Sequence, residues 1–474
     1  MRGLAAWLAL ALGLLTGSAY GQANQSLAGL LERHRANPND AEVCHRIGIA
    51  YVNAEKLADA AGFFRKAVAL VPSFVAARKN LATVLWFLGR HGESEREFQT
   101  VLKQSPEDPV PHLYIGLAEL GRKRFLSAKQ HFIQAGPLAS DNPEVLPAVL
   151  EAYLATGDKT FAAGVIEKFQ RASRPEPELS IRLARVMNRY GMYPYSVTLL
   201  EGIAGAQPDR EDALLLLAEA YDKQNRPEKA YELFVKAIDR NPSAEQPYLA
   251  LTDFAAAHGN AAYAHKTLAR GLETIPGSPR LILRQGILWA IEGNREKALE
   301  RFSAAAAADS KWNVPVLAKG ILELEAGDAA VAAATFREAA KIVPRDHQAE
   351  YLYATALSRS GGGPAQQAEI VTALHRALAI KPDDSRSMLL LGQTLLAQGD
   401  VKAGTAQLEK ALRLDPENTT AQYQLAVTYQ KQGRKAEAQK LFDRFRQSKA
   451  KQREEESVQV QLMKIIENKS SNTP

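Results

Sequence analysis

The chain has 474 residues, of which 59 are Lys or Arg and 53 are Asp or Glu, so its formal net charge at pH 7 is +6. Basic and acidic residues are interleaved along most of the predicted helices, which is typical of a solvated surface and disfavours a nucleic-acid-binding protein. The single cysteine, Cys44, excludes an intramolecular disulfide, so packing alone must stabilise the fold.

Residues 1–21 have the layout of a secretory signal peptide. An early positive charge precedes an apolar run from Leu4 to Leu15, and small and polar residues follow it. The run is shorter than the roughly 20 residues that a membrane-spanning helix needs, which favours a cleaved signal over an uncleaved anchor. Ala19 and Gly21 favour cleavage after Gly21, with cleavage after Ala19 or Ala23 as alternatives. We therefore expect an exported protein, either periplasmic or secreted.

Residues 22–40 are predicted to form an N-terminal capping helix. Leu30 and Pro38 fall at the positions that a large apolar residue and a proline occupy in each of the units that follow. The segment therefore resembles a second helix without its first, which would cover the beginning of a repeat array.

From residue 41 the sequence repeats every 34 residues, a period that decides the architecture before any other signal. Repeats open at residues 41, 75, 109, 143, 177, 211, 245, 279, 313 and 347. Two more open at residues 385 and 419, after a four-residue insertion in the segment "SRSGGGPAQ". The sequence therefore predicts twelve tandem repeats over residues 41–450.

Three positions of the repeat have a fixed size. Position 24 is large and apolar, at Phe64, Phe98, Phe132, Ile166, Leu200, Phe234, Leu268, Phe302, Phe336, Leu374, Leu408 and Phe442. Position 20 is nearly always small, at Ala60, Ser94, Ala128, Ala162, Ser196, Ala230, Ala264, Ala298, Ala332, Gly404 and Ala438. Position 8 is small at Gly48, Ala82, Gly116, Ala184, Ala218, Gly286, Gly320, Ala354, Gly392 and Ala426. Small residues beside a large one allow two helices to approach closely.

Two further positions mark the ends of helices. Position 15 is glycine in nine repeats and Asn225 in another, and both residues tolerate the left-handed conformation that closes a helix. Proline recurs at position 32, where it ends a second helix. Each repeat is therefore predicted to be a helix hairpin.

This pattern resembles the tetratricopeptide repeat, a 34-residue helix–turn–helix unit, over residues 41–450. The resemblance implies an all-α fold, a right-handed superhelical solenoid of about twelve repeats with capping helices. Three departures stand out: Trp is missing from position 4, Leu150 replaces a small residue, and "RASRPEPELS" interrupts the fourth repeat. We therefore expect irregular packing in repeats four and five.

Residues 451–474 are predicted to contain a C-terminal capping helix and a disordered tail. Apolar residues recur at helical spacing at Val458, Leu462, Ile465 and Ile466. A terminal unit needs such an apolar face for its neighbour and a polar face for water.

The sequence contains no motif that indicates catalysis, a cofactor or a metal. It lacks a phosphate loop, an HExxH segment, paired cysteines and a Gly-x-Ser-x-Gly elbow. The three glycines at 361–363 lack the Lys-Ser/Thr pair of a phosphate loop, and a turn separates His258 from His265. We therefore predict that the protein is not an enzyme.

The resemblance implies a concave groove lined by positions 2, 5, 9, 12 and 13 of the first helices, which would bind extended peptides or partner helices. The candidate partner-binding residues, including adjacent arginines, are Trp86, Phe87, Leu113, Leu117, Leu120, Arg182, Arg185, Arg189, Arg280, Leu283, Arg284 and Ile287. The apolar strip indicates either a partner site or packing of the solenoid against itself. The arginines favour a partner segment that carries both apolar and acidic residues.

The sequence therefore predicts an exported, non-catalytic scaffold that binds protein partners. The alternative is a structural component of a cell-envelope machine, for example in exopolysaccharide export or outer-membrane assembly. Both hypotheses involve protein partners, and neither involves a nucleic acid.

Overall fold

The computed structural model describes residues 26–171, 176–207 and 209–451. The predicted signal peptide, residues 1–21, and the apolar residues of the predicted C-terminal capping helix lie outside these ranges. Within the described residues, no helix is long and apolar enough to cross a membrane.

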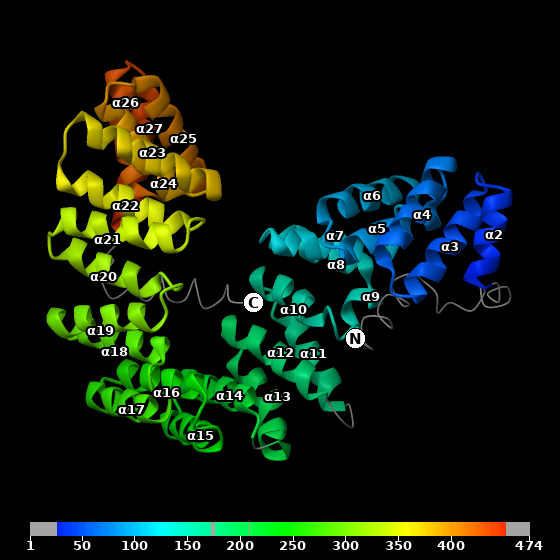
Figure 1. Cartoon of the computed structure of the whole chain (residues 1–474), viewed down its shortest axis with the longest axis horizontal. Helices are drawn as coiled ribbons and strands as arrows, with labels where there is room; N and C mark the ends of the chain where they lie inside the picture. Colours follow the sequence, from blue (N-terminus) through cyan, green and yellow to red (C-terminus); the bar gives the residue numbers. More distant parts are fainter. Residues whose placement is uncertain (1–25, 172–175, 208, 452–474) are drawn as a thin grey trace. The chain divides into compact units, whose positions relative to one another are not determined.

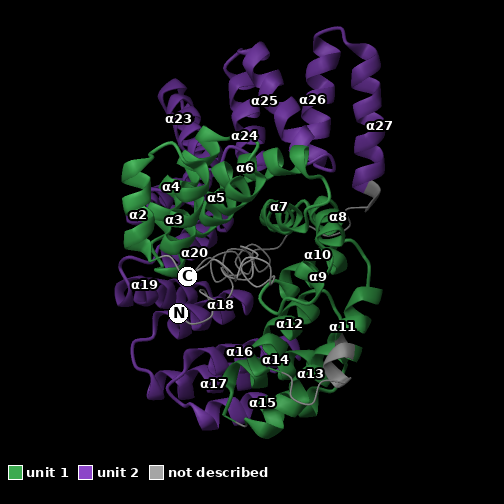
Figure 2. Ribbon diagram, turned by 90° about the vertical axis from the view of Figure 1, so that its right-hand side faces the viewer, with its two compact units in different colours: residues 1–233 green, residues 234–474 purple. Residues whose placement is uncertain are grey.

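The described residues form 26 helices and no strand, so the predicted all-α class is confirmed. The chain divides into two compact units, residues 1–233 and 234–474 (Figure 2). Within each unit, successive helix pairs stack side by side along the chain (Figure 1). This stacking is the predicted solenoid arrangement of helix hairpins.

Unit 1 begins with the single helix α2 and continues with helix pairs and the short extra helix α9. Its helices are α2 (Leu27–Ala36), α3 (Ala41–Asn53), α4 (Leu57–Leu70), α5 (Val75–Phe87), α6 (His91–Gln104), α7 (Pro109–Gly121), α8 (Phe125–Ala135), α9 (Pro137–Ser140), α10 (Leu146–Ala155), α11 (Thr160–Arg171), α12 (Pro177–Arg189), α13 (Tyr193–Ala206) and α14 (Glu211–Lys223). Helix α15 (Pro227–Arg240) contains the limit between the two units.

Unit 2 continues the same alternation of first and second helices. Its helices are α16 (Glu245–Ala257), α17 (Ala261–Thr274), α18 (Pro279–Ile291), α19 (Arg295–Ala308), α20 (Val314–Glu325), α21 (Ala329–Ile342), α22 (His347–Ser360), α23 (Pro364–Ile380), α24 (Ser385–Ala397), α25 (Val401–Leu414), α26 (Thr419–Lys431) and α27 (Lys435–Lys451).

Position 15 has a left-handed backbone in every one of the twelve repeats. Nine of these residues are glycines, such as Gly293 with φ 78°, and Asn225 adopts φ 59°. Glu55 and Lys123 occupy the position in the two remaining repeats and also have positive φ, at 57° and 59°. Because a left-handed residue other than glycine costs about 1–2 kcal/mol, the turn geometry is imposed by the packing of the hairpin in these two repeats.

Small residues at position 8 leave room for the large side chain at position 24 of the same repeat. A Cβ atom added at Gly48 would lie 2.5 Å from the ring of Phe64, and one added at Gly286 would lie 2.6 Å from the ring of Phe302. The corresponding distances are 2.8 Å from Gly116 to the ring of Phe132 and 2.6 Å from Gly320 to the ring of Phe336. The two helices of these hairpins therefore approach until the ring touches the opposite backbone.

Position 20 also lies against the first helix. The hydroxyl of Ser94 donates a hydrogen bond of 2.7 Å to the carbonyl oxygen of Ala82, and both residues are fully buried. Where position 8 is larger than alanine, at Leu150 and Thr252, position 24 is not aromatic. The two larger first-helix residues thus occur only in repeats without an aromatic ring at position 24.

The first irregularity of the repeats lies in repeat three, earlier than the expected repeats four and five. Helix α8 ends at Ala135, Gly136 adopts φ 56°, and the short helix α9 follows. The first helix of repeat four then begins at Leu146 instead of near residue 143. Leu150 is fully buried on this helix, so the large residue at position 8 is accommodated in the core.

The four inserted residues of repeat ten lengthen its helices and leave its turn unchanged. Three residues, 361–363, separate α22 from α23, as three residues separate α24 from α25. Helices α22 and α23 have 14 and 17 residues, whereas α24 and α25 have 13 and 14. Gly361 closes α22 in the left-handed conformation, with φ 70°.

His45 links the first repeat to the second. Its ring packs against Phe64 and Phe74, with centroid distances of 5.6 and 4.9 Å. Its Nε2 lies 2.9 Å from Nδ2 of Asn80, which is buried. Since the amide nitrogen can only donate, Nε2 accepts this hydrogen bond and must be unprotonated. Burial lowers the pKa of His45, Arg46 lowers it further and Glu42 opposes the shift.

Replacing Gly286 by alanine should destabilise its hairpin, because the new Cβ meets the ring of Phe302. Overpacking of this kind costs about 1–3 kcal/mol, more than the roughly 1 kcal/mol that alanine gains over glycine within a helix. Hydrogen exchange should show faster local opening of α18 and α19. Gly62→Ala is the matched control, because no atom lies within 4 Å of its added Cβ. It should slow exchange in α4, and equal effects of the two substitutions would contradict this packing.

Acidification should destabilise repeats one and two through His45. Since the folded pKa of His45 is below its usual 6.5, the unfolded chain binds the proton more readily. Its stabilising contribution is therefore complete above pH 6.5 and is lost as the pH falls through the folded pKa. His45→Gln keeps an acceptor for Asn80 but cannot titrate, so the protection of amides in α3–α5 should depend less on pH in this variant. Identical pH profiles of hydrogen exchange, corrected for intrinsic rates, would refute the role of His45.

Candidate functional site

The candidate site in unit 1 begins with the apolar residues of α5 and α7. Trp86, Phe87, Leu117 and Leu120 are half-buried, whereas Leu113 is only 4% exposed. These four half-buried residues, here called the apolar strip, lie at first-helix positions 9, 12 and 13. Leu113 belongs to the core of the unit, so the accessible part of the predicted groove in these repeats is the apolar strip.

The apolar strip is continuous with a buried aromatic cluster. The ring of Trp86 lies 5.3 Å from that of Tyr114 and 4.5 Å from that of His91. Tyr114 is fully buried and stacks on Phe98 at 5.0 Å, and desolvation raises the pKa of its hydroxyl. Trp86 therefore has one side in the protein core and another open to solvent. Both of the roles expected for it, partner binding and internal packing, are compatible with this position.

The three arginines on α12 differ in their partners. Arg182 contacts Glu144, with 3.1 Å between Nη1 and Oε2, and Arg189 contacts Glu151 on α10 at 2.7 Å. Arg185 lies between them in sequence and is exposed. Desolvation favours a higher pKa for Asp212, but the hydrogen bond from Arg210 and other interactions outweigh it and lower this pKa. The charge of Arg185 makes a small contribution to the lowering. The predicted basic stripe is therefore largely neutralised within unit 1, and Arg185 remains accessible.

The same kind of pairing occurs in unit 2. Arg284 on α18 lies 2.8 Å from Asp253 on α16, and Arg280 lies 4.0 Å from Glu245. Leu283 and Ile287 are buried, with 3% and 1% exposure. Of the four candidate residues in unit 2, Arg280 is the exposed one. The structure thus brings each arginine to an acidic residue of the preceding first helix, and it places both apolar residues in the core.

Asn188 is a buried polar residue beside the arginines on α12. Its amide nitrogen donates to the carbonyl oxygen of Leu216 at 2.9 Å and to Glu219 at 3.0 Å. Its amide oxygen is buried without a hydrogen-bond partner among the described residues. The two acceptors fix the orientation of the amide, because a flipped amide would place its oxygen against both of them. Asn188 therefore fixes α12 relative to α14.

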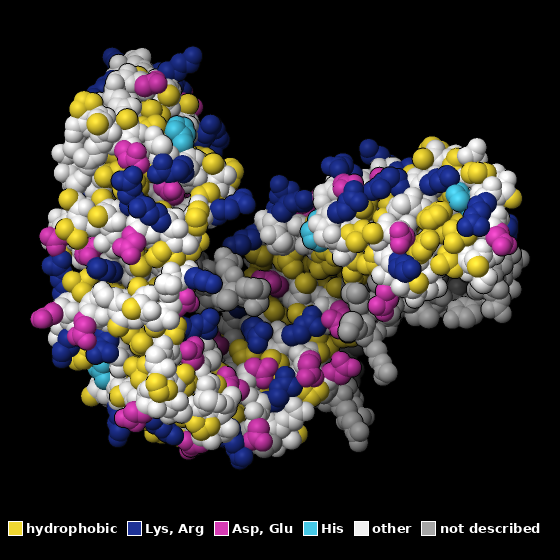
Figure 3. Space-filling view, viewed as in Figure 1, with side chains coloured by type: hydrophobic (Ala, Val, Ile, Leu, Met, Phe, Trp, Pro, Cys, Tyr) yellow, Lys and Arg dark blue, Asp and Glu magenta, His cyan; other side chains and the backbone are white. Residues whose placement is uncertain are grey.

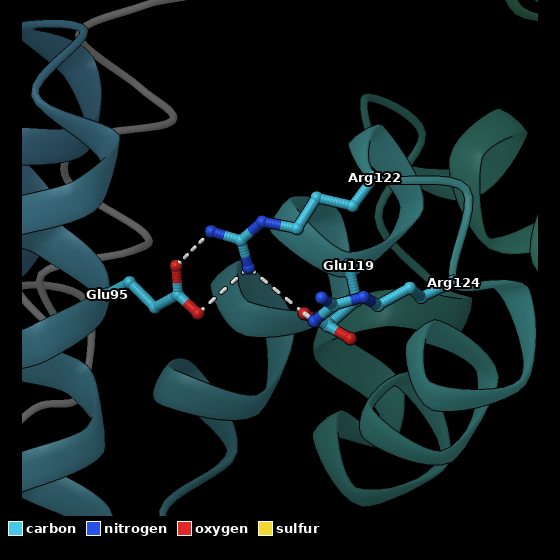
Figure 4. A network of polar contacts seen from close by, with 4 residues as sticks. All are labelled: Glu95, Glu119, Arg122 and Arg124. Carbon is cyan, nitrogen blue, oxygen red and sulfur yellow. Dashed lines mark hydrogen bonds and ion pairs between the residues drawn. The ribbon is translucent and has the colours of Figure 1, made fainter. Parts of the chain in front are cut away.

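A charged network at repeat three was not predicted from the sequence (Figure 4). Arg122 donates to Glu95 at 2.9 and 2.5 Å and to Glu119 at 3.0 Å, and Arg124 donates to Glu119 at 3.2 Å. Burial opposes ionisation of Glu119, but hydrogen bonds from Arg122 and Ser127 outweigh it and lower the pKa of this carboxyl. The network joins α6 to the end of α7. The signal in the sequence was the charge of Glu119 at position 11, where several repeats have tyrosine.

The surface of each unit carries both signs of charge. Lys and Arg side chains are interspersed with Asp and Glu side chains over the face seen in Figure 3. Among the described residues, no three His, Cys, Asp or Glu side chains are grouped as a metal site would require. The first helices of unit 1 thus leave two kinds of accessible group, the half-buried apolar strip and the exposed guanidinium of Arg185.

Family models described as tetratricopeptide repeat match residues 45–109, 213–245, 365–418 and 395–455. A human relative, "Protein O-mannosyl-transferase TMTC3", is 22% identical over 374 residues, which are 76% of this chain and 38% of that protein. The "Peroxisomal targeting signal receptor" of Kluyveromyces lactis is 35% identical over 75 residues, which are 16% of this chain and 13% of the receptor. The chain thus spans well under half the length of either relative.

The solved structures that match most of the chain include the following two. Yeast Tom70 is 15% identical, with a TM-score of 0.43, and the match covers 91% of this chain and 95% of that one. The structure titled "Structure of Naa15/Naa10 bound to HypK-THB" is 13% identical, with a TM-score of 0.42 and coverage of 98% and 97%.

The family matches fall on helix pairs of both units, among them α3–α6 and α24–α27. The small and large residues of these pairs lie at the positions that the repeat pattern requires. This fold supports a protein-binding scaffold as the general function. The chain belongs to the tetratricopeptide repeat family.

Proposed function

We propose that this protein is an exported, non-catalytic scaffold that binds segments of partner proteins along the first helices of its repeats. The observation that carries the proposal is the apolar strip on α5 and α7. It leaves aromatic surface half-open to solvent at first-helix positions that a monomeric solenoid could fill with polar residues. Aromatic side chains that are partly open in this way are typical anchors of protein interfaces.

The charge of the proposed partner follows from Arg185. Arg182 and Arg189 already contact Glu144 and Glu151, so an added acidic group gains less from them. Arg185 is exposed, and it is the member of the stripe that can offer its guanidinium to a carboxylate of a partner. We therefore expect a partner that offers an acidic group to Arg185 and apolar side chains to the apolar strip.

The relatives support protein binding only in general terms. The receptor from Kluyveromyces lactis is named for a targeting signal, and its shared segment is short. The human relative is named as a mannosyl-transferase, but the match covers 38% of its length. We therefore do not propose a transferase activity for this chain.

The alternative is a structural component of a cell-envelope machine, such as exopolysaccharide export or outer-membrane assembly. Affinity purification of the tagged chain from envelope fractions separates the two proposals. A stoichiometric membrane complex would favour the alternative, whereas soluble partners in exchange with the free chain would favour the scaffold.

Arg185→Glu should weaken binding of the partner identified by that purification at least about tenfold, because it turns an attraction into a like-charge repulsion. The melting temperature should hardly change, because surface substitutions of this kind usually change the free energy of unfolding by less than about 0.5 kcal/mol. Lys103→Glu is the control, with the same charge change at an exposed site on the second helix α6. Equal affinities of the two variants would exclude Arg185 from the interface.

Trp86→Ala tests the apolar strip in the same assay. An aromatic anchor lost from an interface costs about 2 kcal/mol or more of binding free energy. Because Trp86 also contacts Tyr114, some loss of stability is expected, so affinity is measured below the onset of melting. A folded variant that binds the partner as tightly as the parent would show that the strip serves internal packing only.

Export has a test that does not involve the partner. Intact-mass measurement of protein from the native envelope should show the loss of roughly the first 21 residues, if the signal is cleaved after Gly21. A mass that retains Met1 would contradict cleavage.

A further inference from the structure

Among the described residues of unit 2, a pair of shallow grooves lies at the same register of the repeat. One is lined by residues of α17, α18 and α19 and has a volume of about 490 Å³. The other is lined by residues of α21 and α22 and has a volume of about 400 Å³. Five residues that line the first groove have an equivalent in the second groove two repeats, or 68 residues, later. The pairs are His265 and Ala333, Ala269 and Arg337, Glu273 and Lys341, Gln285 and Tyr353, and Trp289 and Leu357. The grooves are therefore a product of the repeat, between a second helix and the next first helix.

Internal contacts occupy the basic side chains around the first groove. His265 lies 3.0 Å from Glu292, and its ring is 4.1 Å from that of Trp289. Lys297 covers the same indole at 4.2 Å, and Arg301 lies 3.2 Å from Glu300. Its remaining charged lining residue, the exposed Glu273, is negative, so this groove has no free cation to offer an acidic ligand among the described residues.

The second groove differs because its cations have no such partners. Arg337 and Lys341 are exposed and one helical turn apart on α21, so they lie on one edge of the groove. Neither side chain makes an ion pair or hydrogen bond with any residue that the structure describes. Arg337 does act on the nearby Tyr353, where it opposes the rise in pKa that burial causes. Two uncompensated cations thus stand beside the floor of the groove.

The floor of this groove is apolar and fixed. Ala333 and Tyr353 are each 5% exposed, and Leu357 is half-buried. The carbonyl oxygen of Leu357 accepts a hydrogen bond of 2.7 Å from Gln366, in the first turn of the lengthened helix α23. The inserted residues therefore hold the end of α22 next to the groove. A volume of about 400 Å³ is enough for one or two side chains of a bound segment.

We propose that the groove between α21 and α22 is a second docking surface, which binds an acidic peptide segment of a partner protein. One apolar side chain of the segment lies on Leu357 and Tyr353, and its carboxylates pair with Arg337 and Lys341. Glu338, on the same helix, also lines the groove and would repel a segment that is acidic throughout. We therefore expect the bound segment to combine acidic residues with an apolar one. This surface uses a second helix of unit 2, so it goes beyond the first-helix site of the proposed function.

The test is selection of 12-residue peptides from a random display library on the full chain, with counter-selection on the double variant Arg337→Glu/Lys341→Glu. Enriched peptides should contain Asp or Glu near an apolar residue. A labelled representative should bind the parent chain and lose at least about tenfold in affinity on the double variant. Its affinity should also fall when the salt concentration is raised, because exposed charge pairs are screened.

The control Lys402→Glu/Lys410→Glu makes the same charge change at exposed positions of the second helix α25 and should bind as the parent does. An equal loss of peptide affinity in both double variants would show that binding depends only on net charge, and it would overturn the proposal. Failure to enrich any peptide that depends on Arg337 and Lys341 would also overturn it. Peptides that instead lose binding on Arg185→Glu would support the first-helix site while excluding this groove, so the two proposals fail separately.

Discussion

The close contact between position 8 and position 24 is the constraint on which each hairpin depends. A glycine or alanine on the first helix lets the ring or branched side chain of the second helix reach the opposite backbone, as at Gly286 and Phe302. The tight turn between the two helices accompanies that approach. The turn residue must be left-handed to return the chain within three residues, and packing imposes this conformation even on Glu55 and Lys123. Stability in such an array comes from each hairpin and its neighbours, so a defect is expected to remain local.

Contacts between neighbouring repeats determine which charges remain available for binding. Arginines of one first helix pair with acidic residues of the preceding one, as Arg189 does with Glu151. Each exposed pair contributes little to stability, but it removes a cation from the surface that a partner would see. Arg185, Arg337 and Lys341 form no ion pair with any described residue, so they are more relevant to the binding of an acidic partner than the net charge of +6 is.

A polar residue at a normally apolar position is also stabilised by neighbouring residues. Glu119 replaces an aromatic or apolar residue at position 11, and it is retained in a nearly buried site because Arg122 and Arg124 reach it from the turn that follows its own helix. Removing both arginines would deprive this nearly buried carboxylate of its cations, which costs more than the ion pairs themselves contribute. Repeat three thus has an electrostatic link to α6 in addition to its apolar core.

Sequence alone was enough to predict the helix hairpins, their 34-residue register and the positions of their turns, because these depend on the sizes and conformational preferences of residues within one repeat. It also identified first-helix residues that could face a partner. Only the tertiary structure separated the half-open Trp86 from the buried Leu113, Leu283 and Ile287, since burial depends on the neighbouring repeat. The pairing of Arg182 and Arg189 was decided in the same way, as was the lengthening of α22 and α23 by the insertion. Local preferences are set by adjacent residues in the chain, whereas accessibility and charge pairing are set by residues one repeat away.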